Sequence, residues 1–175
     1  HGKRFRFVAD VSVKGRDPSR PPASASPGVV SGVRETAHLD EGAGGKPTLA
    51  VLPFRLVGVA GPYSTIADAL PHELITALSR LRWLFVIARG SSFRFRSSAF
   101  DFQEIGNLLG VRYCITGLVE VVGDRIGITV ELVGARTGDI IWGERYVGEI
   151  GEIHEIRERI INEVVNALEL QIPQN

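Results

Sequence analysis

The sequence predicts one α/β domain of the α+β kind, in which a five-stranded mixed sheet is covered by three helices in the chain order β-α-β-α-β-β-β-α. Two short apolar runs, at 49–54 and 84–88, are typical of strands buried on both faces of a sheet. Residues 111–147 hold three strand-like stretches joined by tight turns. Residues 152–170 place apolar side chains at helical spacing, which predicts an amphipathic helix.

A change of composition near residue 48 divides the chain into three parts. Residues 1–13 include Arg4–Val8, where basic and apolar residues alternate as in a strand. Residues 14–47 hold five prolines among serine, glycine and alanine. They have few large apolar residues to offset the entropy of ordering, so we expect a flexible linker. Residues 48–172 carry the regular patterns and are predicted to form the folded domain.

The first half of this domain should contain two strands and one helix. In the strand 49–54, Pro53 should lie near the end because proline removes a ladder donor. Apolar residues then repeat at helical spacing from Ile66 to Leu81, but Pro71 interrupts them. Either the helix is kinked at Pro71, or it begins there with Pro71 in its first turn. We favour a helix from about residue 65 with a disturbance near residue 70, followed by the strand 84–88.

The second half should contain a short helix, a three-stranded meander and the long helix. Asp101 is a suitable N-cap and Gly110 a suitable C-terminal stop for a helix between them. The strands should run from 111 to 122, from 125 to 133 and from 140 to 147. The turns between them are Gly123-Asp124 and 137–139. In the helix 152–170, we expect the acidic residues to form a solvated face; they are Glu152, Glu155, Glu158 and Glu163.

Charge and composition argue against several classes of protein. The net charge is zero, but residues 1–48 carry eight Lys/Arg and five Asp/Glu, whereas residues 49–175 carry twelve Arg and fifteen Asp/Glu. A mildly acidic domain is not expected to bind nucleic acid by itself. The single cysteine, Cys114, excludes an internal disulfide and fits a reducing compartment. No apolar stretch approaches the roughly twenty residues of a membrane helix, so no membrane partner is expected.

No catalytic, metal or cofactor site can be assembled from the sequence. The stretch 41–48 superficially resembles a phosphate-binding loop, but Pro47 separates Lys46 from Thr48 and the stretch precedes a strand, so we reject it. The histidines lack metal-ligand spacing; they are His1, His38, His72 and His154. Because no glycine-flanked nucleophile turn occurs either, the domain is predicted not to be an enzyme.

One segment is a candidate ligand site. Residues 89–96 leave the end of the second predicted strand, where open α/β sheets commonly bind ligands. The side chains of Arg89, Ser91 and Ser92, with the serine amides, could hold an anion. Arg94 and Arg96 alternate with two phenylalanines, a pattern that can also stack on bases. The favoured alternative is an ordinary loop in which the phenylalanines pack inward and the arginines extend along them to solvent.

Several blocks of the domain resemble the TolB-amino-terminal-like domains of bacterial regulators. Residues 46–54 (KPTLAVLPF) look like the opening strand of that family, and 74–79 (LITALS) and 86–93 (VIARGSSF) resemble its next blocks. Residues 109–113 (LGVRY) match the following block. The remaining matches, in order, are Gly117, Gly138, Trp142, Glu144, Arg145 and Tyr146. Ala69 and Pro71 depart from the pattern of the first helix, where the family more often has glycine and a residue other than proline.

A second resemblance concerns the amino-terminal tail. Residues 1–8 (HGKRFRFV) look like the closing strand of an OmpR-type winged-helix DNA-binding domain, with Arg4 where glycine is usual. It implies that residues 1–13 are the remnant of such a domain. The recognition helix would lie upstream, so DNA would be bound only through that missing part.

These resemblances imply a cytoplasmic, non-catalytic sensory or interaction domain of a winged-helix transcriptional regulator. It would modulate DNA binding through a partner or ligand. The expected partners are a protein, tetratricopeptide-type repeats downstream, or a second copy of the chain in a homodimer. Two alternatives stay open: an accessory domain of a class III adenylate cyclase-type signalling protein, and an envelope-type protein-interaction module. No cofactor or general catalytic activity comes with the resemblance.

Overall fold

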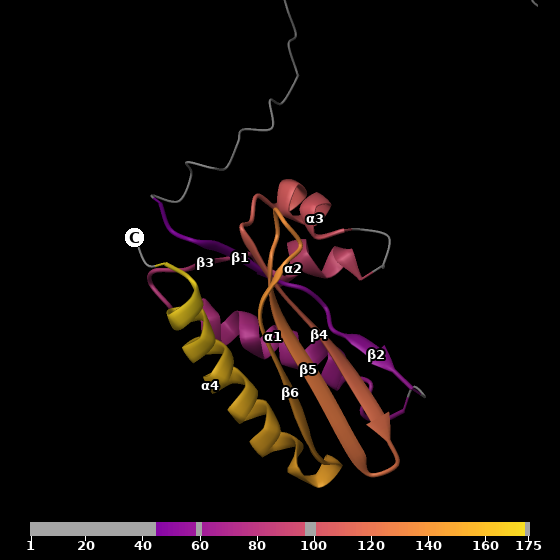
Figure 1. Ribbon diagram of the computed structural model, residues 1–175. Coiled ribbons are helices and arrows are strands. Elements are labelled where there is room, and N and C mark those ends of the chain that lie inside the picture. Colours follow the sequence, from indigo (N-terminus) through magenta and orange to yellow (C-terminus); the bar gives the residue numbers. More distant parts are fainter. Residues whose placement is uncertain (1–44, 59–60, 97–100, 174–175) are drawn as a thin grey trace, which may run out of the picture. The chain divides into compact units, whose positions relative to one another are not determined.

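The computed structural model describes residues 45–58, 61–96 and 101–173 (Figure 1). All of them belong to one compact unit of the chain, residues 36–175. The predicted winged-helix remnant, 1–13, and nearly all of the predicted linker, 14–47, lie outside the described residues.

The sheet has six strands, not the five predicted. Their bounds are β1 Thr48–Val51, β2 Arg55–Val57, β3 Phe85–Val86, β4 Tyr113–Val122, β5 Arg125–Gly134 and β6 Ile140–Glu149. The order across the sheet is β3-β1-β4-β5-β6, and β2 also pairs with β4. The pairs among β1, β2, β3 and β4 are parallel, whereas β5 and β6 run antiparallel, so the predicted mixed sheet and three-stranded meander are confirmed.

The additional strand arises because the predicted strand 49–54 is broken. β1 pairs with the start of β4 and β2 with its middle, so the two lie end to end along one neighbour. The amide of Leu52 still donates to the Ile115 carbonyl, 2.8 Å away. Pro53 has no amide hydrogen, and the Phe54 amide turns away from the sheet to the Ala67 carbonyl, at 3.2 Å. Pro53 therefore divides the strand instead of ending it.

The three predicted helices are present, and a fourth short one was not predicted. The bounds are α1 Ile66–Leu78, α2 Arg89–Ser92, α3 Phe102–Leu109 and α4 Ile153–Gln171. Two 3-10 turns, η1 Phe93–Phe95 and η2 Ile150–Glu152, precede α3 and α4. Pro71 lies inside α1, which runs unbroken from Ile66, so the predicted start near residue 65 is confirmed and the interruption is not seen. The second predicted strand, 84–88, is reduced to the two residues of β3.

Local chemistry sets the ends of these elements. The Asp101 carboxylate accepts from the Glu104 amide at 2.7 Å and caps α3, as predicted. Gly110 ends the same helix in the left-handed conformation, with φ of 65°. Gly123 and Gly138 also have positive φ, of 59° and 74°, at the two turns of the meander. These predictions succeeded because each depends on a few neighbouring residues.

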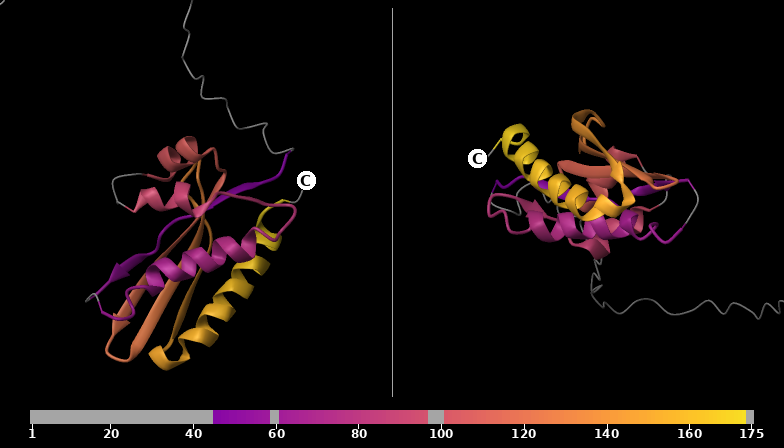
Figure 2. Two further views of the ribbon diagram at one scale, coloured as in Figure 1. Left: turned by 180° about the vertical axis from the view of Figure 1, so that it is seen from behind. Right: turned by 90° about the horizontal axis from the view of Figure 1, so that it is seen from below.

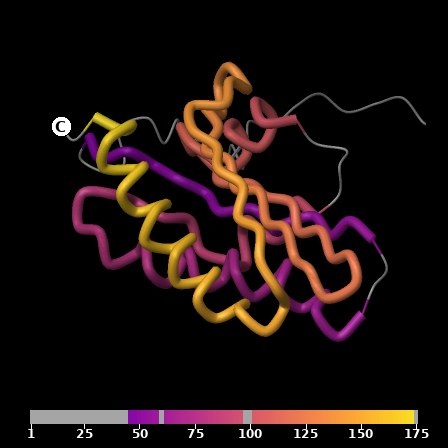
Figure 3. The backbone as a smooth tube through the Cα atoms, turned by 60° about the horizontal axis from the view of Figure 1, so that its bottom comes forward, coloured from indigo at the N-terminus to yellow at the C-terminus, as the bar shows by residue number. Residues whose placement is uncertain are grey.

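Helices α1 and α4 cover one face of the sheet, as the two views in Figure 2 show. In Figure 3 the backbone of α1 runs below the strands, and that of α4 runs alongside β6. The Arg157 guanidinium of α4 makes a bidentate ion pair with the Glu73 carboxylate of α1, in which Nε lies 3.0 Å from Oε2. The main core lies between this helical layer and the sheet, and its fully buried members include Leu49, Leu70, Leu74, Ile128, Leu132, Ile160 and Leu168.

The opposite face of the sheet is covered only at one end. There η1 and α3 pack over β1 and the start of β4 in a smaller core, which contains Ala50, Leu52, Phe95, Ile105, Leu109 and Cys114. The remaining part of this face, over β2, β4, β5 and β6, faces the viewer in Figure 1. It carries exposed residues such as Val122 and Val147. The accessible surface of the domain includes this open face and the edge where β6 meets α4.

Candidate functional site

The segment predicted as a ligand site, 89–96, is helical. Residues Arg89–Ser92 form α2, and the next three form η1. The amides of Ser91 and Ser92 both donate to the Ala88 carbonyl, at 3.0 and 3.3 Å, so they are used inside the turn. Ser92 is fully buried, and its hydroxyl donates to the Arg89 carbonyl at 3.4 Å. The two serines therefore support the turn and do not present their amides to a ligand.

The arginines of this segment lie over its aromatic rings. The Arg89 guanidinium carbon is 4.6 Å from the centre of the Phe93 ring, and that of Arg94 is 4.9 Å from the Phe95 ring. Arg96 lies 5.8 Å from the Phe93 ring and pairs with Asp68 of α1, at 2.7 Å. The ring contacts lie within the segment, the Arg96–Asp68 pair links it to α1, and Phe95 is buried in the smaller core. This resembles the packing arrangement that was the favoured alternative.

The anion-binding role of Arg89, Ser91, Ser92, Arg94 and Arg96 stays a prediction. Thermal shift measurements with phosphate, sulfate and nucleotides test it. Stabilisation that Arg89→Ala abolishes would support the role. If no anion stabilises the domain, and Arg89→Ala behaves as the wild type, the segment has a packing role alone.

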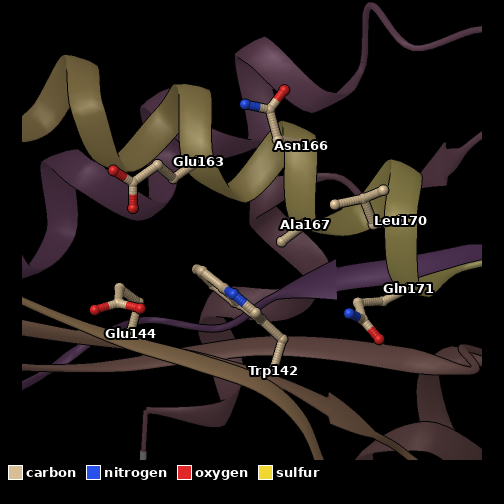
Figure 4. A pocket seen from close by; sticks show the side chains of 7 residues that line it. All are labelled: Trp142, Glu144, Glu163, Asn166, Ala167, Leu170 and Gln171. Carbon is tan, nitrogen blue, oxygen red and sulfur yellow. The ribbon is translucent and has the colours of Figure 1, made fainter.

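A second candidate is a groove of about 200 Å³ between β6 and α4, which we call the β6–α4 groove (Figure 4). The residues that line it include Trp142 and Glu144 of β6 and Glu163, Ala167, Leu170 and Gln171 of α4. Trp142 extends from the strand toward the helix beneath Ala167, and both glutamates lie to one side of its ring. Leu170 is 82% exposed at the rim. The groove therefore combines an aromatic ring, two carboxylates and an apolar rim.

Tyr146 of β6 is buried beside this groove and contacts one of its two carboxylates. Its hydroxyl donates to the Glu163 carboxylate at 2.8 Å. Burial raises the pKa of the Tyr146 phenol well above its ordinary value, and the hydrogen bond and the charges of Glu163 and Glu144 raise it further. Arg159, whose guanidinium lies 5.4 Å from the centre of the Tyr146 ring, acts in the opposite direction. The two carboxylates therefore act on Tyr146 as negative charges, and the positive charge of Arg159 opposes them.

Glu163 was predicted to belong to a solvated face, and this is wrong. It is half-buried and accepts the Tyr146 hydroxyl because β6 passes beneath this turn of α4. Glu152 is exposed, but its carboxylate accepts from the Glu149 amide at 3.1 Å and helps to cap the start of the helix. Among the described residues, neither Glu144 nor Glu163 has a cationic partner.

The open face of the sheet has its own charged pair. The Arg145 guanidinium of β6 reaches across β5 to the Glu120 carboxylate of β4, at 2.6 Å. Gly127 lies between them in β5, and a Cβ added there would meet the guanidinium at 3.0 Å. The absence of a side chain at Gly127 thus leaves room for the pair to cross the sheet.

The two histidines of the described region lie on different helices. His72 is exposed on α1 and His154 is exposed on α4. In the ranges 45–58, 61–96 and 101–173, no group of three or more His, Cys, Asp or Glu side chains is arranged to hold a metal ion. No helix in these ranges is both long and apolar enough to cross a bilayer.

Sequence reasoning missed the β6–α4 groove. Trp142, Glu144 and Tyr146 alternate along one strand and therefore share a face, which could have been recognised. Which turn of the last helix covers that face could not, because it depends on the crossing of two elements. Trp142 and Leu170 are brought together only by that crossing.

The family model described as "HilA/YgeH-like transcriptional regulator, second domain" matches residues 45–165. The chain belongs to this family. The match covers β1 to most of α4, and therefore includes Trp142, Glu144 and Glu163 of the groove.

Similar proteins support the same architecture. The chain is 35% identical over 127 residues to "Putative adenylate cyclase 3" of Rhizobium meliloti strain 1021; the match covers 73% of this chain and 22% of that protein. It thus spans about a fifth of the length of that relative. TolB from Acinetobacter baumannii has a TM-score of 0.50 at 15% identity, covering 70% of this chain and 28% of TolB. This likeness concerns the fold alone and confirms the predicted TolB-like fold.

A further solved structure is a lipoprotein of Neisseria meningitidis, with a TM-score of 0.49 at 14% identity. The match covers 69% of this chain and 98% of the lipoprotein.

Proposed function

We propose that residues 45–173 are a non-catalytic sensory or interaction domain that regulates a DNA-binding domain of the same polypeptide. The observation that carries the proposal is the family itself, whose members are described as the second domain of transcriptional regulators. Under this proposal, the second domain acts on the output of the DNA-binding domain. The resemblance of residues 1–8 to the closing strand of an OmpR-type winged helix supports the same arrangement.

The mechanism would be recognition of a protein partner or ligand at an accessible surface of this domain. The predicted linker, 14–47, makes rigid coupling unsuitable, whereas dimerisation or a change in effective concentration requires no fixed geometry. The partner could be a separate protein, tetratricopeptide-type repeats downstream, or a second copy of the chain. A regulator of this kind would act in the cytoplasm, where its DNA is.

The test uses the full-length parent protein. Residues 45–173 are deleted, or replaced by an unrelated folded domain of similar size as the matched control. Promoter occupancy and transcription are measured in cells, and DNA affinity is measured in vitro. We expect the deletion and the replacement to change transcription alike, while the winged-helix part still binds DNA. Unchanged occupancy, affinity and transcription in both variants would overturn the proposal.

A second candidate function is an accessory role in a signalling enzyme such as a class III adenylate cyclase. The relative described as a putative adenylate cyclase favours it, because 127 residues of that protein align with this domain. The parent gene distinguishes the two hypotheses. A helix-turn-helix pattern before residue 1 supports the regulator, whereas a cyclase pattern of metal-binding aspartates supports the signalling enzyme. A signal peptide or lipoprotein cysteine would favour the third hypothesis, an envelope-type interaction module.

A further inference from the structure

The β6–α4 groove has the chemistry of a site for an organic cation. Trp142 lines the groove with an indole, the aromatic ring that attracts cations most strongly. The carboxylates of Glu144 and Glu163 lie to one side of that ring (Figure 4). Neither carboxylate has a cationic partner among the described residues. An aromatic ring and two carboxylates that form no ion pair among the described residues together favour a positively charged occupant.

A contact between a cation and an aromatic ring already exists between α4 and β6, at Tyr146. The Arg159 guanidinium of α4 lies 5.4 Å from the centre of the Tyr146 ring of β6, and the Tyr146 hydroxyl donates to Glu163. At Tyr146 the aromatic ring, the carboxylate and the arginine all belong to the domain. At Trp142 the ring and the carboxylates are present, but α4 contributes Ala167 and Leu170 to the groove and no arginine.

The size and the apolar rim of the groove further restrict which occupants can fit it. A volume of about 200 Å³ is below the roughly 300–1000 Å³ typical of sites for drug-sized ligands, and suits a single side chain. Ala167 and the exposed Leu170 provide an apolar wall for an aliphatic stem. Residues 49–175 carry three more acidic than basic side chains, which favours approach by a basic segment.

We propose that the β6–α4 groove binds the side chain of an arginine presented by a partner protein. This deepens the proposed function, on which it rests, by naming the chemistry that the interaction domain recognises. Arginine fits better than lysine because its planar guanidinium can stack on the Trp142 indole while its edge donates to the carboxylates of Glu144 and Glu163. An ammonium group is a compact charge that cannot do both equally well.

Titration of the complete 175-residue chain with a capped Gly-Arg-Gly peptide tests the proposal. The readout is the chemical shift of the Trp142 indole N–H and of the backbone amides of Leu170 and Gln171. We expect saturable shifts confined to the groove. A capped Gly-Lys-Gly peptide should bind several-fold more weakly, and the citrulline peptide, which is neutral and nearly isosteric, should not bind measurably.

Substitutions of the carboxylates test whether the arginine peptide binds at the groove or elsewhere on the acidic surface. Glu144→Gln combined with Glu163→Gln should weaken the arginine peptide by roughly tenfold or more, because two charge-assisted contacts are lost. The new amide oxygen at position 163 can still accept the Tyr146 hydroxyl, so the fold should be retained. Glu158→Gln, an equal loss of charge at an exposed position of α4 away from the groove, should bind like the wild type.

The proposal is overturned if no saturable shifts appear, if the citrulline peptide binds equally well, or if the double variant keeps its affinity. Tighter binding of free L-arginine than of the capped peptide would assign the groove to the amino acid and also overturn it. The domain deletion described above is independent of these outcomes. If the deletion changes transcription but the double variant does not in the full-length protein, the regulatory role stands and the groove does not recognise the partner.

Discussion

The amide of Phe54 donates to the carbonyl of Ala67, at 3.2 Å. Phe54 directly follows Pro53, and Ala67 lies four residues before Pro71 of α1. Ala67 is the residue whose carbonyl would accept from the amide of residue 71 in a regular α-helix, but residue 71 is proline. Phe54 is the residue released from the sheet by Pro53. The strand break and the helix proline therefore compensate each other, since the donor freed by one meets the acceptor left by the other.

This bond predicts slow hydrogen exchange at Phe54, although the residue lies in neither β1 nor β2. Its amide is buried and bonded, so we expect protection approaching that of Leu52, whose amide donates to the Ile115 carbonyl. Tyr63, exposed in the turn before α1 and without a backbone partner for its amide among the described residues, should exchange fast. Hydrogen exchange is measured by NMR. If the Phe54 amide exchanges as fast as the Tyr63 amide, the hydrogen bond between Phe54 and Ala67 does not form in solution.

The Phe54 ring makes a second specific contact, with Gly117 in the middle of β4. A Cβ added to Gly117 would lie 2.7 Å from the ring and 2.7 Å from the Thr129 carbonyl oxygen, closer than real Cβ contacts. We therefore expect Gly117→Ala to lower the free energy of unfolding by about 1–3 kcal/mol, since a buried ring and a backbone strand must shift. Urea denaturation measures the change.

Gly127→Ala provides the matched control, because Gly127 lies in the neighbouring central strand. The nearest atom to its added Cβ is the tip of the Arg145 guanidinium at 3.0 Å, which can rotate away. Loss of the exposed pair with Glu120 costs only about 0–1 kcal/mol. Gly127→Ala should therefore be nearly neutral. Equal destabilisation by both substitutions would mean that the Phe54 ring is not what requires glycine at 117.

The predictions from sequence that succeeded share a physical cause. The Asp101 cap, the Gly123 turn and the amphipathic pattern of residues 152–170 each depend on chemistry within a few residues. Short-range rules apply to such features without knowledge of the fold. The predicted TolB-like fold relied instead on a pattern spread over the whole domain.

The features that were missed depend on contacts between distant segments. The helix Arg89–Ser92 has no capping side chain and contains glycine and two serines, so intrinsic helix propensity does not predict it. The burial of Ser92 depends instead on segments that are distant in the sequence. The break at Pro53 became a second strand only because β4 continues past it. The β6–α4 groove likewise required the crossing of a strand and a helix. None of these relationships is encoded in a local pattern.

Tyr146→Phe should destabilise the domain by about 1.5–3 kcal/mol, the range for a hydrogen bond to a charged group. The substitution keeps the ring but leaves the half-buried Glu163 carboxylate without the donor that now lies 2.8 Å away. Glu163→Gln is the control, because its amide oxygen can accept the same hydroxyl and should preserve most of the stability. Denaturation at pH 7 compares the three proteins. A Tyr146→Phe variant as stable as the wild type would show that water replaces the lost bond.

Cys114 lies fully buried in the smaller core, between the sheet and α3. Burial raises the pKa of its thiol from 9.0 to about 12. The folded protein therefore keeps the thiol protonated at a pH where the unfolded chain has released the proton. The contribution of this group to stability is fully present below pH 9 and is lost as the pH rises toward 12.

Alkaline pH should therefore destabilise the wild type more than Cys114→Ala. Above pH 9 the wild type should lose up to about 1.4 kcal/mol of unfolding free energy per pH unit through this thiol. The alanine variant starts less stable at neutral pH because it leaves a small cavity. Its curve should then approach that of the wild type between pH 9 and 10, below the range where Tyr146 contributes. Urea denaturation across this range gives both curves, and curves that stay parallel would mean that the thiol ionises equally in the folded and unfolded chains.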